Sequence, residues 1–384
     1  MEGISASWAF SVYREQCRLE EEWHRTEQEN DRLRGELVDV TQDRDRIKAQ
    51  FLALHRKQFK AKRTSKAPAT KAVGVWLHHQ LKLPFRQTQD LFATLFGMAF
   101  VPASALSFSL TAADRSQPLY DDLREKIRAS TLLHLDETSW RLDGLPAWLW
   151  YAGNADLDFF HIDRSRATAV IAAILGDAFS GDIISDGYAV YDAILARWRQ
   201  TCLAHIIRTA KEIAAEIQLI EYPVPYQSDI TFAMTMADFF SEVCALDRKR
   251  RAGRLSRKQA RAMIPSLRRR LKALCAAKLS HPKTLNLRDR LLSPERDAKK
   301  LFTFLTHPGM PPTNNHAERA LRGPVISRKI SFGSRSEAGA HAFAVLASLL
   351  GTARRQNQPA LRFLHTLFTA DIDAAQAALY KNSA

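Results

Sequence analysis

Two aspartates stand where short apolar runs end, in positions from which their carboxylates could bind a metal ion. Residues 131–135 lead into Asp136, and residues 182–185 lead into Asp186. Side chains at strand ends project into the crevice at the edge of an open α/β sheet, where ligands usually bind. Hard divalent cations prefer oxygen ligands such as carboxylates. Glu318, in a segment expected to form a helix facing that sheet, is a third candidate.

Such a set of carboxylates suits the cleavage of phosphodiesters. The reaction develops charge on the attacking, leaving and non-bridging oxygens, and two Mg²⁺ or Mn²⁺ ions about 3.5–4 Å apart can stabilise it. Spacing alone leaves the assignment open, because a lone Asp after a strand is more often a cap or turn residue. By composition the following carboxylates are equally plausible: Glu137, Asp143, Asp182 and Asp192.

The charge of the chain favours a polyanionic partner. Its 384 residues include 56 Lys and Arg against 41 Asp and Glu, a formal net charge of +15. Basic side chains gain affinity for nucleic acids by releasing counterions from phosphates. Binding to a membrane surface would need a basic amphipathic helix with an aromatic face, and none is evident. Without a bilayer-spanning apolar run or a secretory signal pattern, we expect a cytoplasmic protein with no membrane partner.

The first 129 residues are predicted to hold two domains. Residues 1–56 form a coiled-coil dimerisation helix, because apolar residues recur at alternating spacings of four and three from Leu19 to Leu54. A lone amphipathic helix packed on the core is the alternative. Residues 57–129 comprise a linker, in which Lys62 and Arg63 suit phosphate contact, and helices on either side of Gly97. These helices are typical of a helix-turn-helix, a pattern that many small bundles share.

The next segment, residues 130–211, alternates strand and helix patterns. Strands are expected at 131–135, 147–151, 159–163, 182–185 and 201–203, and helices at 166–175 and 191–198. This order predicts an α/β fold with a mixed sheet covered by helices.

The remainder of the chain interrupts this pattern and then returns to it. Residues 212–310 form a basic helical insertion, in which Arg250, Arg251 and Arg269 suit contact with the DNA backbone. Residues 311–384 return to the core with the helix of Glu318, whose start Asn314 or Asn315 can cap. A small-residue helix is expected at 338–355.

Several sequence blocks, in order and spacing, resemble the IS66-type insertion-sequence transposases over about residues 70–365. The block from Pro312 to Arg322 is long and distinctive. The blocks are His134-Leu-Asp-Glu-Thr-Ser-Trp140, Ile184-Ser-Asp-Gly-Tyr188, Cys202-Leu-Ala-His-Ile-Ile-Arg208, Pro312-Thr-Asn-Asn-His-Ala-Glu-Arg-Ala-Leu-Arg322 and Arg328-Lys-Ile-Ser-Phe-Gly-Ser334.

The resemblance implies a ribonuclease-H-like core with a DDE triad of Asp136, Asp186 and Glu318, which would hold two Mg²⁺ or Mn²⁺ ions. It also implies binding of double-stranded DNA at terminal inverted repeats, followed by strand cleavage and strand transfer. The protein would act as a homodimer or higher oligomer in the bacterial cytoplasm, at the nucleoid. Small accessory proteins encoded by the same element are further expected partners.

Further candidate residues lie in the same blocks. His205 and Arg208 are predicted near the catalytic pocket, where they contact the scissile phosphate or orient a carboxylate; structural packing is an equal alternative. The remaining candidate contacts to DNA are Asn315, Arg319, Arg322, Arg328 and Lys329.

One departure from the family concerns zinc. Members often carry a cysteine-rich zinc-binding segment between the coiled coil and the core, but this chain has no cysteine between Cys17 and Cys202. We therefore expect no zinc. Two alternatives to a transposase stay open: a catalytically inactive or domesticated sequence-specific DNA-binding protein, and a nuclease without strand transfer.

Overall fold

A computed structural model of the protein describes residues 67–98, 100–307 and 309–381. The chain divides into two compact units, of which one comprises Ser65–Gln89 and Phe100–Ala384. The other comprises Met1–Thr64 and Asp90–Ala99. The predicted coiled coil of residues 1–56 lies outside the described residues, as do Lys62 and Arg63 of the basic linker.

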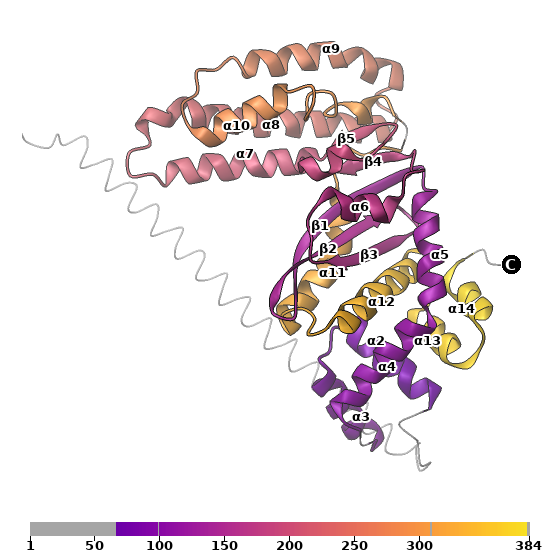
Figure 1. The fold of residues 1–384 in the computed structure, drawn as a ribbon. Coiled ribbons are helices and arrows are strands. Elements are labelled where there is room, and N and C mark those ends of the chain that lie inside the picture. The colour runs from indigo at the N-terminus through magenta and orange to yellow at the C-terminus, as the bar shows by residue number, and fades with distance from the viewer. Residues whose placement is uncertain (1–66, 99, 308, 382–384) are drawn as a thin grey trace, which may run out of the picture. The chain divides into compact units, whose positions relative to one another are not determined.

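Five strands form one mixed sheet in the order β3-β2-β1-β4-β5 (Figure 1). Strands β1, β2 and β3 pair antiparallel, whereas β4 and β5 run parallel to β1. The α/β prediction is confirmed, and the sheet is compatible with the expected ribonuclease-H-like core. The bounds are β1 Leu132–Leu142, β2 Leu145–Gly153, β3 Asp158–Asp163, β4 Asp182–Ser185 and β5 Arg199–Thr201.

Strand β1 is longer than predicted. It passes through Asp136 and ends at Leu142, because antiparallel pairing with β2 continues to the tight turn at Asp143 and Gly144. Both turn residues have positive φ, 54° and 73°, as two-residue hairpins require. Pairing with β4 covers only the first part of β1 and stops at His134. Asp136 therefore lies inside a strand, just beyond the point where β4 ceases to pair.

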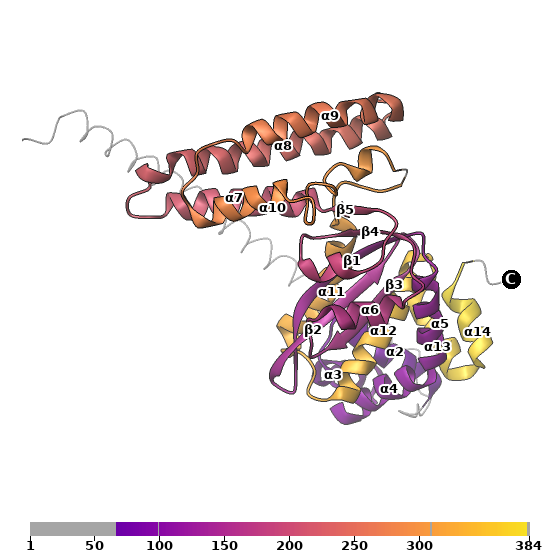
Figure 2. The ribbon, with the colours of Figure 1, turned by 45° about the horizontal axis from the view of Figure 1, so that its top comes forward.

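Each face of the sheet is covered by helices. Trp140, Leu149 and Tyr151 lie in a buried cluster with residues of α11 (Asn315–Ser331) and α12 (Glu337–Arg355). The views of Figures 1 and 2 place α6 (Thr168–Leu175) over the opposite face. Because side chains alternate along a strand, neighbouring residues of β1 face different helices.

Short helices precede and follow this core. They confirm the helical prediction for the segment before the sheet, and α3 ends at Gly97, whose φ is +61°. Helix α2 packs against α4 and α13. No helix in the described part of the chain is long and apolar enough to cross a membrane. The bounds are α2 Pro68–His79, α3 Phe85–Phe96, α4 Pro102–Arg115, α5 Gln117–Arg128, α13 Ala360–Thr369 and α14 Ile372–Leu379.

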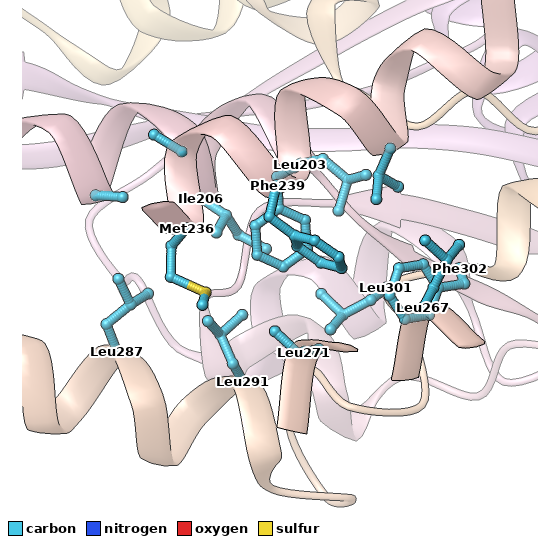
Figure 3. Close-up of a cluster of buried hydrophobic side chains, with 14 of the residues drawn as sticks. Leu203, Ile206, Met236, Phe239, Leu267, Leu271, Leu287, Leu291, Leu301 and Phe302 are labelled. Atoms are coloured by element: carbon cyan, nitrogen blue, oxygen red, sulfur yellow. The ribbon is translucent and has the colours of Figure 1, made fainter. Parts of the chain in front are cut away.

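Four α-helices lie between β5 and α11 in the described part of the chain, where the sequence predicts a helical insertion at residues 212–310. Helices α7 (Leu203–Gln218), α8 (Gln227–Arg251), α9 (Arg257–Leu274) and α10 (Pro282–Leu292) share one hydrophobic core. Figure 3 shows its centre, where Met236 and Phe239 of α8 meet side chains from α7, α9 and α10. The same cluster includes Ile184 of β4, so the core of the insertion is continuous with that of the sheet.

The helix predicted at 191–198 is wrong. The segment is a short 3₁₀ turn, η1 (Ala189–Ala193), followed by extended chain. Its carbonyl at Trp198 accepts a hydrogen bond from the N–H of Ile183, so the chain must straighten to enter the sheet beside β4. Two other 3₁₀ turns are η2 (Val224–Tyr226) and η3 (Thr303–Leu305).

Candidate active site

The register of two parallel strands brings Asp136 and Asp186 level with each other. The last paired residues of β1 and β4 are His134 and Ile184. Asp136 and Asp186, which directly follows β4, each lie two residues beyond that last pair, at the same end of the two strands. Because side chains alternate along a strand, Asp136 leaves the sheet on the same face as His134, the face that α11 covers.

Asp186 begins a turn that its own carboxylate closes. Its Oδ1 accepts the N–H of Tyr188 at 3.0 Å. The guanidinium of Arg290, from α10, packs directly on the intervening Gly187, where an added Cβ would lie 1.6 Å from Nη2. Glycine therefore lets the helical insertion approach the turn. Sequence analysis missed Arg290, and the glycine of the Ser-Asp-Gly block was the available signal.

Glu318 lies in the first turn of α11 and meets two residues of α7. Its Oε1 accepts a hydrogen bond from Nη2 of Arg208 at 2.9 Å. Nε2 of His205 lies 3.6 Å from the same oxygen. The structure thus brings together three residues that the sequence blocks singled out, from helices 110 positions apart. The N-terminal end of α11 is also a favourable place for a carboxylate, because the helix dipole is positive there.

The pKa of Asp136 is raised by burial and by the neighbouring carboxylates. This residue is 8% exposed, and burial raises its pKa well above the ordinary value. The neighbouring carboxylates of Asp186, Glu137 and Glu318 raise the pKa further, and the N–H of Glu137 opposes them by donating to Oδ1 at 2.9 Å. A cation placed among these groups would relieve their repulsion.

His205 lies in the same field. Burial lowers the pKa of its imidazole, although the carboxylates of Asp186 and Glu318 raise it. Nδ1 is buried and has no hydrogen-bond partner among the described residues. The lowered pKa favours the neutral ring at neutral pH, so His205 is not a fixed positive charge.

The three predicted ligands suit a hard divalent cation, because all of their donor atoms are carboxylate oxygens. As the side chains stand, residues 67–98, 100–307 and 309–381 contain no group of three or more His, Cys, Asp or Glu residues that could hold a metal ion. Glu318 is instead turned toward Arg208. Metal binding by all three carboxylates would therefore require Glu318 to move away from that arginine.

Asn314 connects the elements that carry the carboxylates. It is fully buried; its Nδ2 donates to the carbonyl of Leu135, and its Oδ1 is bonded to Nδ1 of His134, both at 2.8 Å. Its N–H donates to Sγ of Cys202 at 3.0 Å, at the start of α7. The predicted cap is wrong, since no side chain caps α11. A buried amide must satisfy its own hydrogen bonds, and here it does so between β1 and α11.

Glu137 lies on the opposite face of β1 and holds the loop that follows β4. It accepts Nη2 of Arg166 at 2.7 Å and the hydroxyl of Tyr191. The guanidinium of Arg166 lies 4.1 Å from the ring centroid of Trp148 and 4.0 Å from that of Tyr188. The sequence left Glu137 open as an alternative metal ligand. In the structure its carboxylate instead holds Arg166 and Tyr191 in place.

The other three alternative carboxylates are engaged elsewhere. Asp143 forms the β1–β2 turn. Asp182 pairs with Arg197 at 2.9 Å, at the beginning of β4 rather than at its end. Asp192 pairs with Lys300.

The candidate DNA contacts on α11 fall into two groups. Asn315, Arg319 and Arg322 are exposed along the helix that carries Glu318. Arg328 instead reaches back to β1, where its Nη1 contacts the carbonyl and hydroxyl of Ser139. Lys329 is exposed beside it.

The basic residues of the insertion differ in accessibility. Arg250 and Arg251 both form ion pairs with Asp247, one helical turn earlier, at 2.8 and 2.6 Å. The side chain of Arg250 is only 14% exposed, against 61% for Arg251. Arg269 is exposed on α9. Arg251 and Arg269 are therefore better placed than Arg250 to meet a polyanion.

An α/β fold that gathers carboxylates beside exposed arginines is suited to bind a divalent cation and a polyanion. The model of the family described as Transposase IS66 family matches residues 63–342, a stretch that includes Asp136, Asp186 and Glu318. The chain therefore belongs to the IS66 transposase family, and the resemblance seen in the sequence is confirmed. Membership supports a transposase function and implies DNA binding and a divalent metal requirement. No curated protein matches the chain.

Proposed function

We propose that the protein is a DDE transposase that binds the terminal inverted repeats of its element, cleaves DNA and joins the freed strand to a target. Its core would be ribonuclease-H-like, with Asp136, Asp186 and Glu318 as the triad. The observation that carries the proposal is that Asp136 and Asp186 lie equally far beyond the last paired residues of β1 and β4, with Glu318 in the first turn of the helix that covers that face. The family match lends independent support.

The triad would hold two Mg²⁺ or Mn²⁺ ions. When bound, such ions stabilise the charge that develops on the attacking, leaving and non-bridging oxygens. Asp136 would offer its oxygens from β1, Asp186 from the turn after β4, and Glu318 from the start of α11. If Glu318 turned away from Arg208 to hold the metal, Arg208 would become available to bind a phosphate oxygen. The neutral His205 can then orient either group by a hydrogen bond.

The DNA would be held largely through its backbone. Asn315, Arg319 and Arg322 would contact phosphates beside the triad, as would Arg251 and Arg269 on the insertion. Residues 57–115 would recognise the element ends. A homodimer or larger assembly is physically sensible, because two DNA ends must be held together. Accessory proteins of the same element are proposed as further partners.

A catalytically inactive DNA-binding protein is the second candidate. The pairing of Glu318 with Arg208 favours it, because the carboxylate is satisfied without a metal ion. The same basic surfaces would serve such a protein equally well. The two proposals differ in one respect, which is whether the bound DNA is cleaved when Mg²⁺ or Mn²⁺ is supplied.

The experiment is cleavage of a labelled duplex that carries the element ends, with Mg²⁺ or Mn²⁺. Wild type is compared with Asp136→Asn, Asp186→Asn and Glu318→Gln, and binding is measured for each. Metal-dependent nicking that every substitution abolishes, while binding persists, supports the transposase. Tight binding with no cleavage in either metal, even after the accessory proteins are added, would favour the inactive DNA-binding protein.

A further inference from the structure

A groove lies beside the part of β1 that extends past β4. It has a volume of about 460 Å³ and is lined by cationic and aromatic side chains. Arg141 comes from the end of β1, Trp148 from β2, and Arg328, Lys329 and Phe332 from the end of α11. None of the described residues that line it is acidic. The groove therefore carries a net positive charge. Of its aromatic residues, Trp140 is buried and Trp148 is stacked with Arg166, so Phe332 offers the exposed ring.

Phe332 is the most conspicuous of these residues. Its side chain is 78% exposed, although burying a phenylalanine would be favourable. Its backbone is left-handed, with φ of 60°, which is costly for a residue with a bulky side chain. Its N–H donates to the carbonyl of Arg328 at 2.7 Å, so the conformation ends α11. The fold thus accepts a strained backbone and an exposed ring at one position.

The loop that presents Phe332 is anchored to β1. Ser334 donates its N–H to the carbonyl of Arg141 at 2.8 Å and accepts the N–H of Asp143 at 2.8 Å. Between them Gly333 has φ of +109°, and a Cβ there would lie 2.2 Å from the carbonyl oxygen of Arg141. Because the backbone is held at these points, the ring of Phe332 is offered in a defined position.

The cations around the ring retain capacity for a ligand. Arg328 contacts β1 only through Nη1, so Nε and Nη2 have no partner among the described residues. Lys329 is exposed next to it, and Arg141 is exposed across the groove. Aromatic rings that stack on bases, set among cations that bind phosphates, are typical of sites for unpaired nucleic acid strands.

We propose that this groove binds an unpaired nucleotide of the DNA, with its base stacked on Phe332 and its phosphate held by Arg328 and Lys329. The inference rests on the proposed function, because it places the nucleotide next to the triad. Ser139, which borders the groove, lies three residues from Asp136 along β1, or about 10 Å.

The test measures binding of the full chain without divalent metal, so that cleavage plays no part. Two short duplexes are compared, one blunt and one with an unpaired extension that contains 2-aminopurine, whose fluorescence falls on stacking. Wild type should favour the extended duplex. Phe332→Ala should lose that preference by about 5- to 150-fold and lose the quenching, whereas Phe332→Trp should keep both.

The matched control is Tyr222→Ala, which removes an aromatic ring that is 73% exposed on the helical insertion. It should leave the preference unchanged. Lys329→Ala should weaken binding to both duplexes equally. It should also reduce the slope of log affinity against log salt by about one. Equal loss on both duplexes for Phe332→Ala, or an unchanged preference, would overturn the proposal. An unchanged preference together with a smaller sedimenting species would assign Phe332 to self-association instead.

The outcome for the groove is separate from the outcome for the triad. A protein that never cleaves DNA but shows the Phe332-dependent preference would refute the transposase and leave the groove in place. A protein that cleaves DNA normally but lacks that preference would support the transposase and refute the groove proposal.

Discussion

Arg208 on α7 and Glu318 on α11 form an ion pair at 2.9 Å, and this pair occupies the carboxylate that completes the proposed triad. Both side chains are partly exposed, 53% and 31%, so the pair contributes little to stability. We propose that the pair is a resting state, in which the arginine neutralises Glu318 until metal and phosphate bind.

Arg208→Ala is therefore expected to affect DNA binding far more than folding. The free energy of unfolding should change by less than about 1 kcal/mol. The slope of log affinity against log salt should fall by about one, because one phosphate contact is lost. Arg164→Ala, which breaks a comparable exposed pair with Glu337, is the control and should leave the slope unchanged. An unaltered slope for Arg208→Ala would remove this residue from the DNA interface.

Asp136→Asn should stabilise the protein in the absence of metal. Burial and the neighbouring carboxylates raise the pKa of Asp136, so the folded state loses stability as pH rises above about 3.9, the ordinary value. At pH 7 the asparagine removes that cost, and the thermal midpoint should rise.

With added Mg²⁺ or Mn²⁺, wild type should become more stable than Asp136→Asn. A site filled at 100 times its Kd stabilises wild type by about 2.7 kcal/mol, and the variant should gain less. Asp143→Asn, at the exposed β1–β2 turn, should respond to metal as wild type does. If Asp136→Asn and wild type gain the same thermal shift from metal, Asp136 is not a ligand.

Glu137→Gln should reduce metal affinity and DNA cleavage by about 10- to 100-fold, as expected for a group that orients the ligands. The glutamine cannot maintain the charged bonds to Arg166 and Tyr191 that hold the loop after β4. Arg166→Ala should cause a similar loss, and the double variant should be little worse than either. Fully additive losses would show that the two residues do not act together.

Asn314→Ala should destabilise the fold by at least about 2 kcal/mol. It leaves the carbonyl of Leu135 and the ring of His134 buried without their partner, at about 1–3 kcal/mol for each group. Urea unfolding measures the change. Asn315→Ala, at the exposed next position, should cost under about 0.5 kcal/mol and serves as the matched control. Similar values for both would mean that the Asn314 amide does not hold β1 to α11.

Asp229 should make the helical insertion sensitive to acid. Burial alone would raise the pKa of Asp229, but hydrogen bonds from the Thr284 hydroxyl and from the N–H of His281 lower it below the ordinary value. Its contribution is therefore complete above about pH 3.9 and is lost as pH falls through the folded-state pKa.

Asp229→Asn should accordingly cost about 1–3 kcal/mol at pH 7, and the difference from wild type should shrink in acid. Asp238→Asn, on the exposed side of the same helix, should cost little at any pH. Unfolding in urea at several pH values measures both. A deficit for Asp229→Asn that stays constant down to acid pH would contradict a role for the ionised carboxylate.

The sequence by itself determined the elements whose signals are local. Strand β4 with Asp186 directly after it, and helix α11 with Glu318 in its first turn, follow from apolar patterning and flanking residues. The sequence blocks added the family. These features depend on neighbours within about one turn or one strand, so a linear reading captures them.

The tertiary structure decided how those elements meet. Asp136 lies inside β1 because β2 continues to pair after β4 has stopped. The side-chain amide of Asn314 donates a hydrogen bond to β1 instead of capping α11, and Arg208 donates a hydrogen bond to Glu318. These contacts join residues more than 100 positions apart, and any of several nearby polar groups could have made them by composition. Only the packing of the folded chain selects which buried group bonds to which.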